Sequence, residues 1–200
     1  MKLEVINLEK KFKDFTAVNN VNFSIEEGQT LGVLGPNGCG KTTTIGMLLG
    51  LIKPSGGRIL IDGKNFEDIN REKILSEFNF ASPYVELPKK LTVKENLEIY
   101  GRLYSVKDLT KRIQQISNDL NLGLFLDKKT GELSSGQKNR VSLAKSLINN
   151  PKVLFLDEPT ASLDPDIGDF VRKYIEEYKS KNRISILLAS HNMKEVERLC

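Results

Sequence analysis

The spacing of apolar and polar residues predicts strands in the first third of this chain. Val21, Phe23 and Ile25 alternate with polar residues, as in a strand that buries one face. A short apolar run follows, and then a helical segment that ends before Pro54. The elements expected here are strands at residues 21–25, 30–34 and 58–61 and a helix at residues 41–51.

The pattern changes between about residues 83 and 130, where the alternation typical of strands disappears. Helical periodicity replaces it at residues 95–104 and 109–120. We therefore predict a helical subdomain at about residues 83–130, inserted into a core formed by about residues 1–82 and 131–200.

Strands and helices alternate again after this region, which favours an α/β fold. Four consecutive apolar residues at 153–156 suit a strand that is covered on both faces, as in a parallel sheet. The expected elements are helices at 134–149 and 167–180, a helix starting at 194, and strands at 153–156 and 185–189. The last helix has no termination signal before Cys200, so we expect the sequence to be clipped there.

Composition is that of an ordinary globular protein, with 39% hydrophobic and 28% charged residues among 200. The net charge of +4 is dispersed, so no nucleic-acid surface is expected. No apolar run approaches the roughly 18 residues needed to cross a bilayer, and the first residues do not resemble a signal peptide. Two cysteines are too few for a disulfide framework, which fits a reducing cytosol.

A complete phosphate-loop pattern, G-x-x-x-x-G-K-[ST], lies between the strand at 30–34 and the helix at 41–51. Small residues let backbone N–H groups surround phosphate oxygens, and the helix directs the positive end of its dipole to the same place. Lys41 can reach the β- and γ-phosphates, and the Thr42 hydroxyl can ligate Mg²⁺. The candidate nucleotide-binding residues are Gly35, Pro36, Asn37, Gly38, Cys39, Gly40, Lys41, Thr42 and Thr43.

Two adjacent acids, Asp157 and Glu158, follow the buried strand at 153–156. Burial of both carboxylates is costly unless a cation or hydrogen-bond donors compensate. Asp157 is a candidate Mg²⁺ ligand, directly or through water, and Glu158 a candidate base for the attacking water. A solvated Asp-Glu turn is the alternative, which the phosphate loop disfavours.

A second helix N-terminus is predicted at Ser134, Ser135, Gly136 and Gln137, where Ser134 and Gln137 have the spacing of a capping box. Such an N-terminus is a potential anion site. One γ-phosphate needs only one such anion site, so the second site is interpreted as a binding site for the nucleotide of a partner subunit. An ordinary capped helix is the alternative.

These motifs together resemble the ATP-binding subunits of ABC transporters. Residues 133–137 resemble the LSGGQ signature, with Ser135 in place of the first glycine. Residues 157–160 resemble the extended Walker B motif, residues 161–164 the D-loop, and Ser190-His191 the switch histidine. The order of the motifs also matches the family, and they cover nearly the whole chain. The phosphate loop and its surroundings are most similar to bacterial exporters of the multidrug, antibiotic or peptide kind.

The resemblance implies a single domain with a P-loop NTPase (RecA-like) core, an N-terminal antiparallel β subdomain and the inserted helical subdomain. It implies ATP and Mg²⁺ as ligands, with Lys41 and Glu158 in catalysis and His191 at the γ-phosphate. Phe12 would stack on adenine. Ser134 and Gly136 would contact the γ-phosphate of the opposite subunit in a head-to-tail dimer, and Asp164 would line the seam between subunits.

One position departs from the family pattern. The family normally has a glutamine where the strand enters the helical subdomain, and Ser82 occupies the expected position. The serine hydroxyl can still bind Mg²⁺ or water, but its reach is shorter. We therefore expect hydrolysis that is slower or more dependent on a partner.

The resemblance implies a homodimer or heterodimer with a second ATP-binding subunit and a separate membrane-spanning permease that docks near residues 87–97. The chain would then lie in the cytoplasm, peripheral on the inner face of the cell membrane. Three alternatives remain: a soluble ABC ATPase that acts on ribosomes or DNA, a P-loop kinase or GTPase, and a binding module that does not hydrolyse nucleotide. The signature segment disfavours the second, and Glu158 with His191 disfavours the third.

Overall fold

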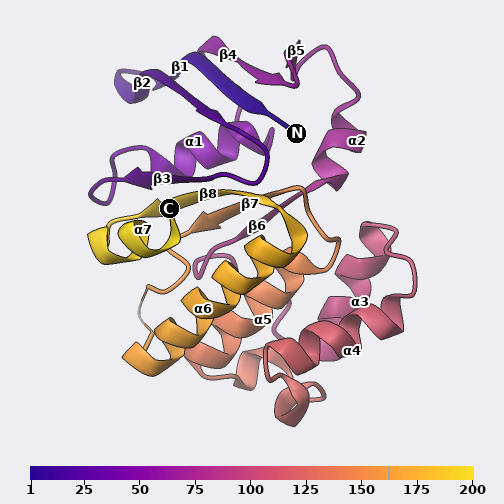
Figure 1. Ribbon diagram of the computed structural model, residues 1–200. Helices are drawn as coiled ribbons and strands as arrows, with labels where there is room; N and C mark the ends of the chain where they lie inside the picture. The colour runs from indigo at the N-terminus through magenta and orange to yellow at the C-terminus, as the bar shows by residue number, and fades with distance from the viewer. Residues whose placement is uncertain (162) are drawn as a thin grey trace.

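Two four-stranded sheets organise the protein in the computed structural model, which describes residues 1–161 and 163–200 (Figure 1). The antiparallel sheet has the order β2-β1-β4-β5, with β1 (Leu3–Phe12), β2 (Phe15–Ile25), β4 (Gly56–Ile61) and β5 (Lys64–Asn65). The parallel sheet has the order β3-β8-β7-β6, with β3 (Thr30–Leu34), β8 (Ser185–Ser190), β7 (Val153–Asp157) and β6 (Phe78–Ala81). The predicted α/β class and both sheet types are confirmed.

Helices cover both faces of the parallel sheet. They are α1 (Lys41–Leu48), α2 (Arg71–Ser76), α3 (Val93–Leu103), α4 (Leu109–Asp119), α5 (Ser135–Leu147), α6 (Pro165–Asn182) and α7 (Met193–Leu199), with 3-10 turns at Gly123–Phe125 and Thr130–Glu132. Among the described residues, no helix combines the length and apolar character that crossing a bilayer requires.

The side chains of β7 alternate between two hydrophobic cores, as expected for a strand with two covered faces. Leu154 and Leu156 pack in the core formed with α5 and α6. Val153 and Phe155 pack in the other core, together with α1 and the antiparallel sheet. Figure 1 shows α1 between the two sheets. The alternation directs the next residue, Asp157, toward α1.

The largest differences from the sequence-based prediction are two element boundaries and one helix. Helix α1 ends at Leu48 rather than at residue 51, because Gly50 adopts a left-handed conformation with φ of 67°. Strand β2 begins six residues before the predicted strand, since pairing with β1 extends it through polar positions. Helix α2 was not predicted, because none of its six residues is buried and it lacks an apolar stripe.

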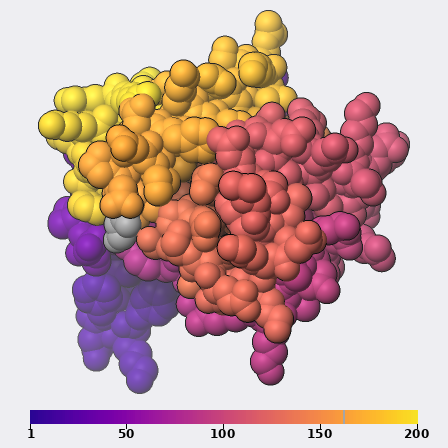
Figure 2. Space-filling model, turned by 90° about the horizontal axis from the view of Figure 1, so that it is seen from below, coloured from indigo at the N-terminus to yellow at the C-terminus, as the bar shows by residue number. Residues whose placement is uncertain are grey.

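Residues 82–134 contain α3, α4 and the two 3-10 turns between β6 and α5. The side chains of Thr92 and Glu95 form a reciprocal capping box at the start of α3. Viewed from below in Figure 2, the helical segments cover this side of the molecule, and the N-terminal strands lie at its edge. On these grounds we propose that residues 83–130 form the expected helical subdomain.

Lys145 of α5 joins the helical side to the parallel sheet. Its Nζ donates to the carbonyl oxygen of Phe80 at 2.8 Å and lies 5.4 Å from the centre of the Tyr100 ring. Burial lowers the pKa of Lys145 from 10.5 to about 8, because the charged amine loses its hydration. Between these two values the unfolded chain binds more protons than the folded chain, so this lysine makes stability rise with pH.

In the wild-type protein, Lys145 should raise the free energy of unfolding by up to about 3 kcal/mol between pH 8 and pH 10.5. We expect the Lys145→Met variant to lack this rise. Urea titrations at several pH values in this window would measure it. Lys94→Met, at an exposed lysine on α3, is the matched control and should keep the rise. Identical pH dependence in the two variants would contradict the prediction.

Candidate active site

The predicted phosphate loop connects β3 to α1, and two of its glycines have backbone angles that other residues avoid. Gly38 has φ of 84° and Gly40 has φ of 99°. A Cβ atom at Gly40 would also lie 2.3 Å from the carbonyl oxygen of Ala17 in β2. The loop therefore packs directly on the antiparallel sheet, and only glycine fits at this contact.

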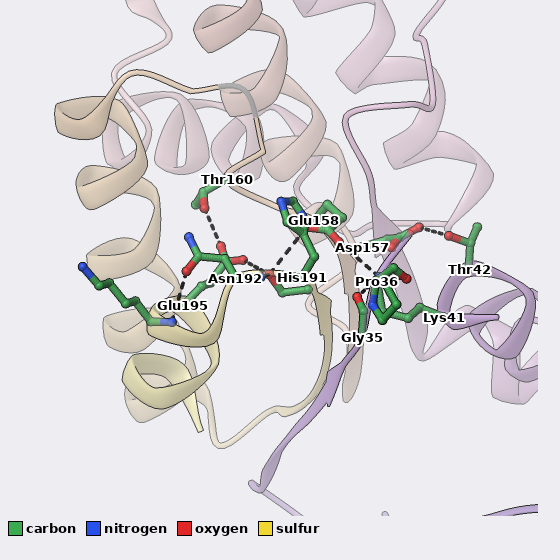
Figure 3. Close-up of polar contacts among 12 residues, drawn as sticks. Gly35, Pro36, Lys41, Thr42, Asp157, Glu158, Thr160, His191, Asn192 and Glu195 are labelled. Atoms are coloured by element: carbon green, nitrogen blue, oxygen red, sulfur yellow. Dashed lines mark hydrogen bonds and ion pairs between the residues drawn. The ribbon is translucent and has the colours of Figure 1, made fainter. Parts of the chain in front are cut away.

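Lys41 at the first position of α1 is buried, and its amine folds back over the loop (Figure 3). Nζ donates to the carbonyl oxygens of Gly35 at 2.6 Å and Pro36 at 3.2 Å. It also lies 3.4 Å from Oε1 of Glu158. The positive charge is thus held at the loop by neutral carbonyls and one carboxylate, where a phosphate could replace the carboxylate.

Thr42 and Asp157 meet at the base of the loop, as the alternation along β7 predicts. The Thr42 hydroxyl donates to Oδ2 of Asp157 at 2.7 Å. Burial raises the pKa of Asp157, while the bond from Thr42 opposes this effect. Two hard oxygen donors beside a phosphate site fit Mg²⁺, which commonly takes one or two protein ligands and fills its shell with phosphate and water. Among the described residues, no group of three His, Cys, Asp or Glu side chains could enclose a metal by itself.

Glu158 is only 4% exposed and lies between the side chains of Lys41 and His191. Nδ1 of His191 contacts Oε2 of Glu158 at 2.7 Å, while Lys41 approaches Oε1. Oε1 is buried without a hydrogen-bond partner, although it forms an ion pair with Lys41. The backbone of Glu158 has φ of 54°, which turns the chain out of β7. One carboxylate oxygen therefore remains available to accept a proton.

A cavity of about 220 Å³ lies over these groups. Nine of the predicted site residues line it: Phe12, Asn37, Gly38, Gly40, Lys41, Thr42, Thr43, Asp157 and Glu158. Gly35 and Pro36 instead provide carbonyl oxygens to Lys41, and Cys39 is an exposed free thiol. Phe12, at the end of β1, lines the cavity, and its stacking on a base stays a prediction.

Phe15 and Tyr84 also line this cavity, and the sequence analysis missed both. Phe15 pairs with Phe12 across the tight turn between β1 and β2, so an aromatic three residues after Phe12 was an available signal. No local pattern distinguishes Tyr84, because it reaches the cavity from the segment after β6.

Ser82 does not join the group around the cavity. It is buried, and its hydroxyl accepts a hydrogen bond from the backbone N–H of Tyr84 at 3.3 Å. It lines a neighbouring cavity of about 250 Å³ instead. The arrangement gives no support to Ser82 as a metal ligand, since it does not line the cavity that Thr42 and Asp157 share.

The second predicted helix N-terminus has the expected capping box. Ser134 accepts a bond from the N–H of Gln137, and the Gln137 side chain accepts one from the N–H of Ser134. Ser134 and Ser135 are exposed, Gly136 is buried against Ile167, and none of these residues lines the nucleotide cavity. Within the adjacent D-loop-like segment, Ser162 lies outside the described residues, and Asp164 precedes α6.

Comparisons with known proteins agree on one family. The model of the family described as ABC transporter matches residues 18–161. The chain is 37% identical over 196 residues to the Nod factor export ATP-binding protein I of Burkholderia lata, which covers 97% of this chain and 64% of that protein. The chain therefore spans less than two thirds of that relative's length.

Two solved structures are similar over nearly the whole chain. The dimeric post-hydrolysis state of the ATP-binding cassette MJ0796, bound to ADP and Pi, has a TM-score of 0.87 and 26% identity, over 98% of this chain and 90% of that one. CbiO1 from Clostridium perfringens, part of the ABC transporter complex cbiONQ, has a TM-score of 0.82 and 31% identity, over 99% of this chain and 81% of that one.

Proposed function

The chain belongs to the ABC transporter family of ATP-binding proteins, and from this premise we propose that it hydrolyses ATP in a head-to-tail dimer that powers a separate membrane-spanning subunit. The observation that carries the proposal is Glu158, a buried carboxylate held between Lys41 and His191 beside the Thr42–Asp157 pair. This arrangement combines a phosphate-binding cation, a base and metal-binding oxygens around one cavity.

Each group has a role in the proposed hydrolysis. Lys41 binds the β- and γ-phosphates, and Phe12 stacks on the adenine ring. Glu158 accepts a proton from water as the water oxygen attacks the γ-phosphorus and the bond to the β-phosphate oxygen breaks. His191 donates to the γ-phosphate. Mg²⁺, bound by Thr42 and Asp157, would neutralise charge on the phosphate oxygens.

The exposed signature segment supports the dimer. Ser134 is exposed and lies outside the nucleotide cavity of its own chain, so its hydroxyl hydrogen is available to the nucleotide of a second chain. A dimeric cassette with bound ADP and Pi among the similar structures supports the same arrangement. The second chain is an identical copy or a related ATP-binding subunit.

The cavity beside Ser82 supports the docking of a membrane subunit. Apolar atoms form most of its lining surface, and Val85, one of the lining residues, is 46% exposed. It adjoins residues 87–97, where we expect the permease to bind, and CbiO1 is described as part of a transporter complex. The chain then acts on the inner face of the cell membrane. The name of the Burkholderia relative favours export over import.

Co-expression with the membrane proteins encoded by neighbouring reading frames tests this function. We expect the tagged chain to purify from detergent-solubilised membranes together with a membrane-spanning protein and to hydrolyse ATP in that complex. Val85→Asp should release the partner, because it places a charge in the apolar interface. Leu124→Asp, at a side chain that is 94% exposed elsewhere, is the matched control. Recovery with ribosomes and without a membrane protein would contradict the proposal.

A further inference from the structure

Glu195 is an enclosed carboxylate that the proposed hydrolysis does not use. It lies on α7 and is only 2% exposed. Oε2 accepts a hydrogen bond from the Ser190 hydroxyl at 2.6 Å, and Oε1 accepts one from the Thr160 hydroxyl at 2.5 Å (Figure 3). Burial of a carboxylate is costly, so hydrogen bonds to both oxygens are needed to hold it there.

The two hydroxyls come from the two turns that carry the reacting groups. Ser190 ends β8 directly before His191, and its oxygen also accepts from the N–H of Asn192 at 3.0 Å. This bond from Asn192 to Ser190 spans His191. Thr160 lies two residues after Glu158 and accepts from Nη1 of Arg172 at 3.3 Å. Glu195 thus joins the turn of His191 to the turn of Glu158.

The Ser190 hydroxyl has one hydrogen and two carboxylates within reach, Glu195 and Glu158. Ser190 Oγ lies 2.6 Å from Glu195 but 3.5 Å from Oε2 of Glu158. The shorter distance favours donation to Glu195, and Nδ1 of His191, at 2.7 Å, is then the nearest polar partner of Oε2 of Glu158. Without the Glu195 carboxylate, the serine hydroxyl could rotate toward Glu158 and compete with His191 for the same oxygen.

We propose that Glu195 is a positioning residue for hydrolysis, which fixes the His191 turn against the Glu158 turn and keeps the Ser190 hydroxyl away from Glu158. It does not touch the nucleotide cavity and acts only through Ser190 and Thr160. This inference rests on the proposed ATP hydrolysis. Its effect falls on the geometry of the reacting groups, so it should change kcat and leave nucleotide affinity unchanged.

The test compares Glu195→Gln with the wild-type protein. The amide keeps the size of the side chain, but only its oxygen can accept, so one of the two hydroxyls loses its acceptor. We expect kcat to fall roughly 10- to 100-fold, as for small displacements of reacting groups, while the Kd for a fluorescent ATP analogue stays within about twofold. Glu176→Gln is the control, because Glu176 binds Arg198 of α7 at 2.7 Å and thus anchors the same helix without touching either turn.

A second pair of variants tests the link if Glu195→Gln does not fold. Thr160→Ser keeps the hydroxyl and should retain kcat, whereas Thr160→Val removes only the hydroxyl and should lower kcat as Glu195→Gln does. Equal kcat in Thr160→Ser and Thr160→Val, or an unchanged kcat in Glu195→Gln, would overturn the inference. Absence of hydrolysis in the wild-type protein would instead refute the proposed function, so the two failures are distinguishable.

Discussion

Replacement of Glu158 by glutamine is expected to lower the rate of ATP hydrolysis at least about 100-fold while ATP binding is retained. Glutamine has nearly the same shape, and its amide cannot accept the proton that leaves the attacking water. Lys41, Thr42 and Asp157 still bind the phosphates and Mg²⁺. Phosphate release measures the first effect, and titration with a fluorescent ATP analogue measures the second.

The same variant should accumulate as a dimer when magnesium and ATP are present. The γ-phosphate then persists and is contacted by Lys41 of one chain and Ser134 of the other. Light scattering coupled to size-exclusion chromatography, in the presence of the membrane subunits, would detect the dimer. Glu67→Gln, at an exposed acid remote from the cavity, should behave as wild type. Saturation of the Glu158 variant with nucleotide without pairing would contradict the dimer mechanism.

A mixture of two inactive variants is expected to recover ATP hydrolysis. Lys41→Met removes the cation that binds the phosphates, and Ser134→Arg blocks the surface that we expect to meet the partner's nucleotide. In a head-to-tail dimer of one copy of each, one site carries both substitutions and the other site carries neither. The mixture should regain roughly a quarter of the wild-type rate at most, since half of random dimers are mixed and each has one intact site.

The control for this mixture is Lys41→Met combined with the double variant Lys41→Met/Ser134→Arg, which has no intact site in any pairing. Steady-state phosphate release compares the mixtures at equal protein concentration. Full activity of Ser134→Arg alone would show that the signature segment is not needed, and the head-to-tail arrangement would then be wrong.

The sequence was most informative where function depends on consecutive residues. The phosphate loop, the Asp157-Glu158 pair and the capping box at Ser134 are local patterns. In the structure, loop residues and both acids line one cavity, and the capping box forms. The four consecutive apolar residues of β7 predicted the parallel sheet, because a strand buried on both faces does not alternate apolar and polar residues.

Other parts of the site depend on tertiary contacts that no local pattern encodes. Tyr84 reaches the cavity from the segment after β6, while Ser82 turns away, although the two are separated by one residue. Glu195 looks like an ordinary acid in the first turn of a helix, and only the meeting of β7, β8 and α7 shows its two partners. Helix α2 was missed because it buries none of its residues.

The position of α1 between the two sheets has a mechanical consequence. Ile45, Met47 and Leu48 share one hydrophobic core with strands of both sheets. Each buried side chain of this size contributes about 1.5 to 3 kcal/mol, so separation of the sheets would forfeit many such contributions at once. We therefore expect the half of the molecule that binds phosphate to move as one rigid unit. Displacement of the α3–α4 region, or of a second subunit, is then the expected response to hydrolysis.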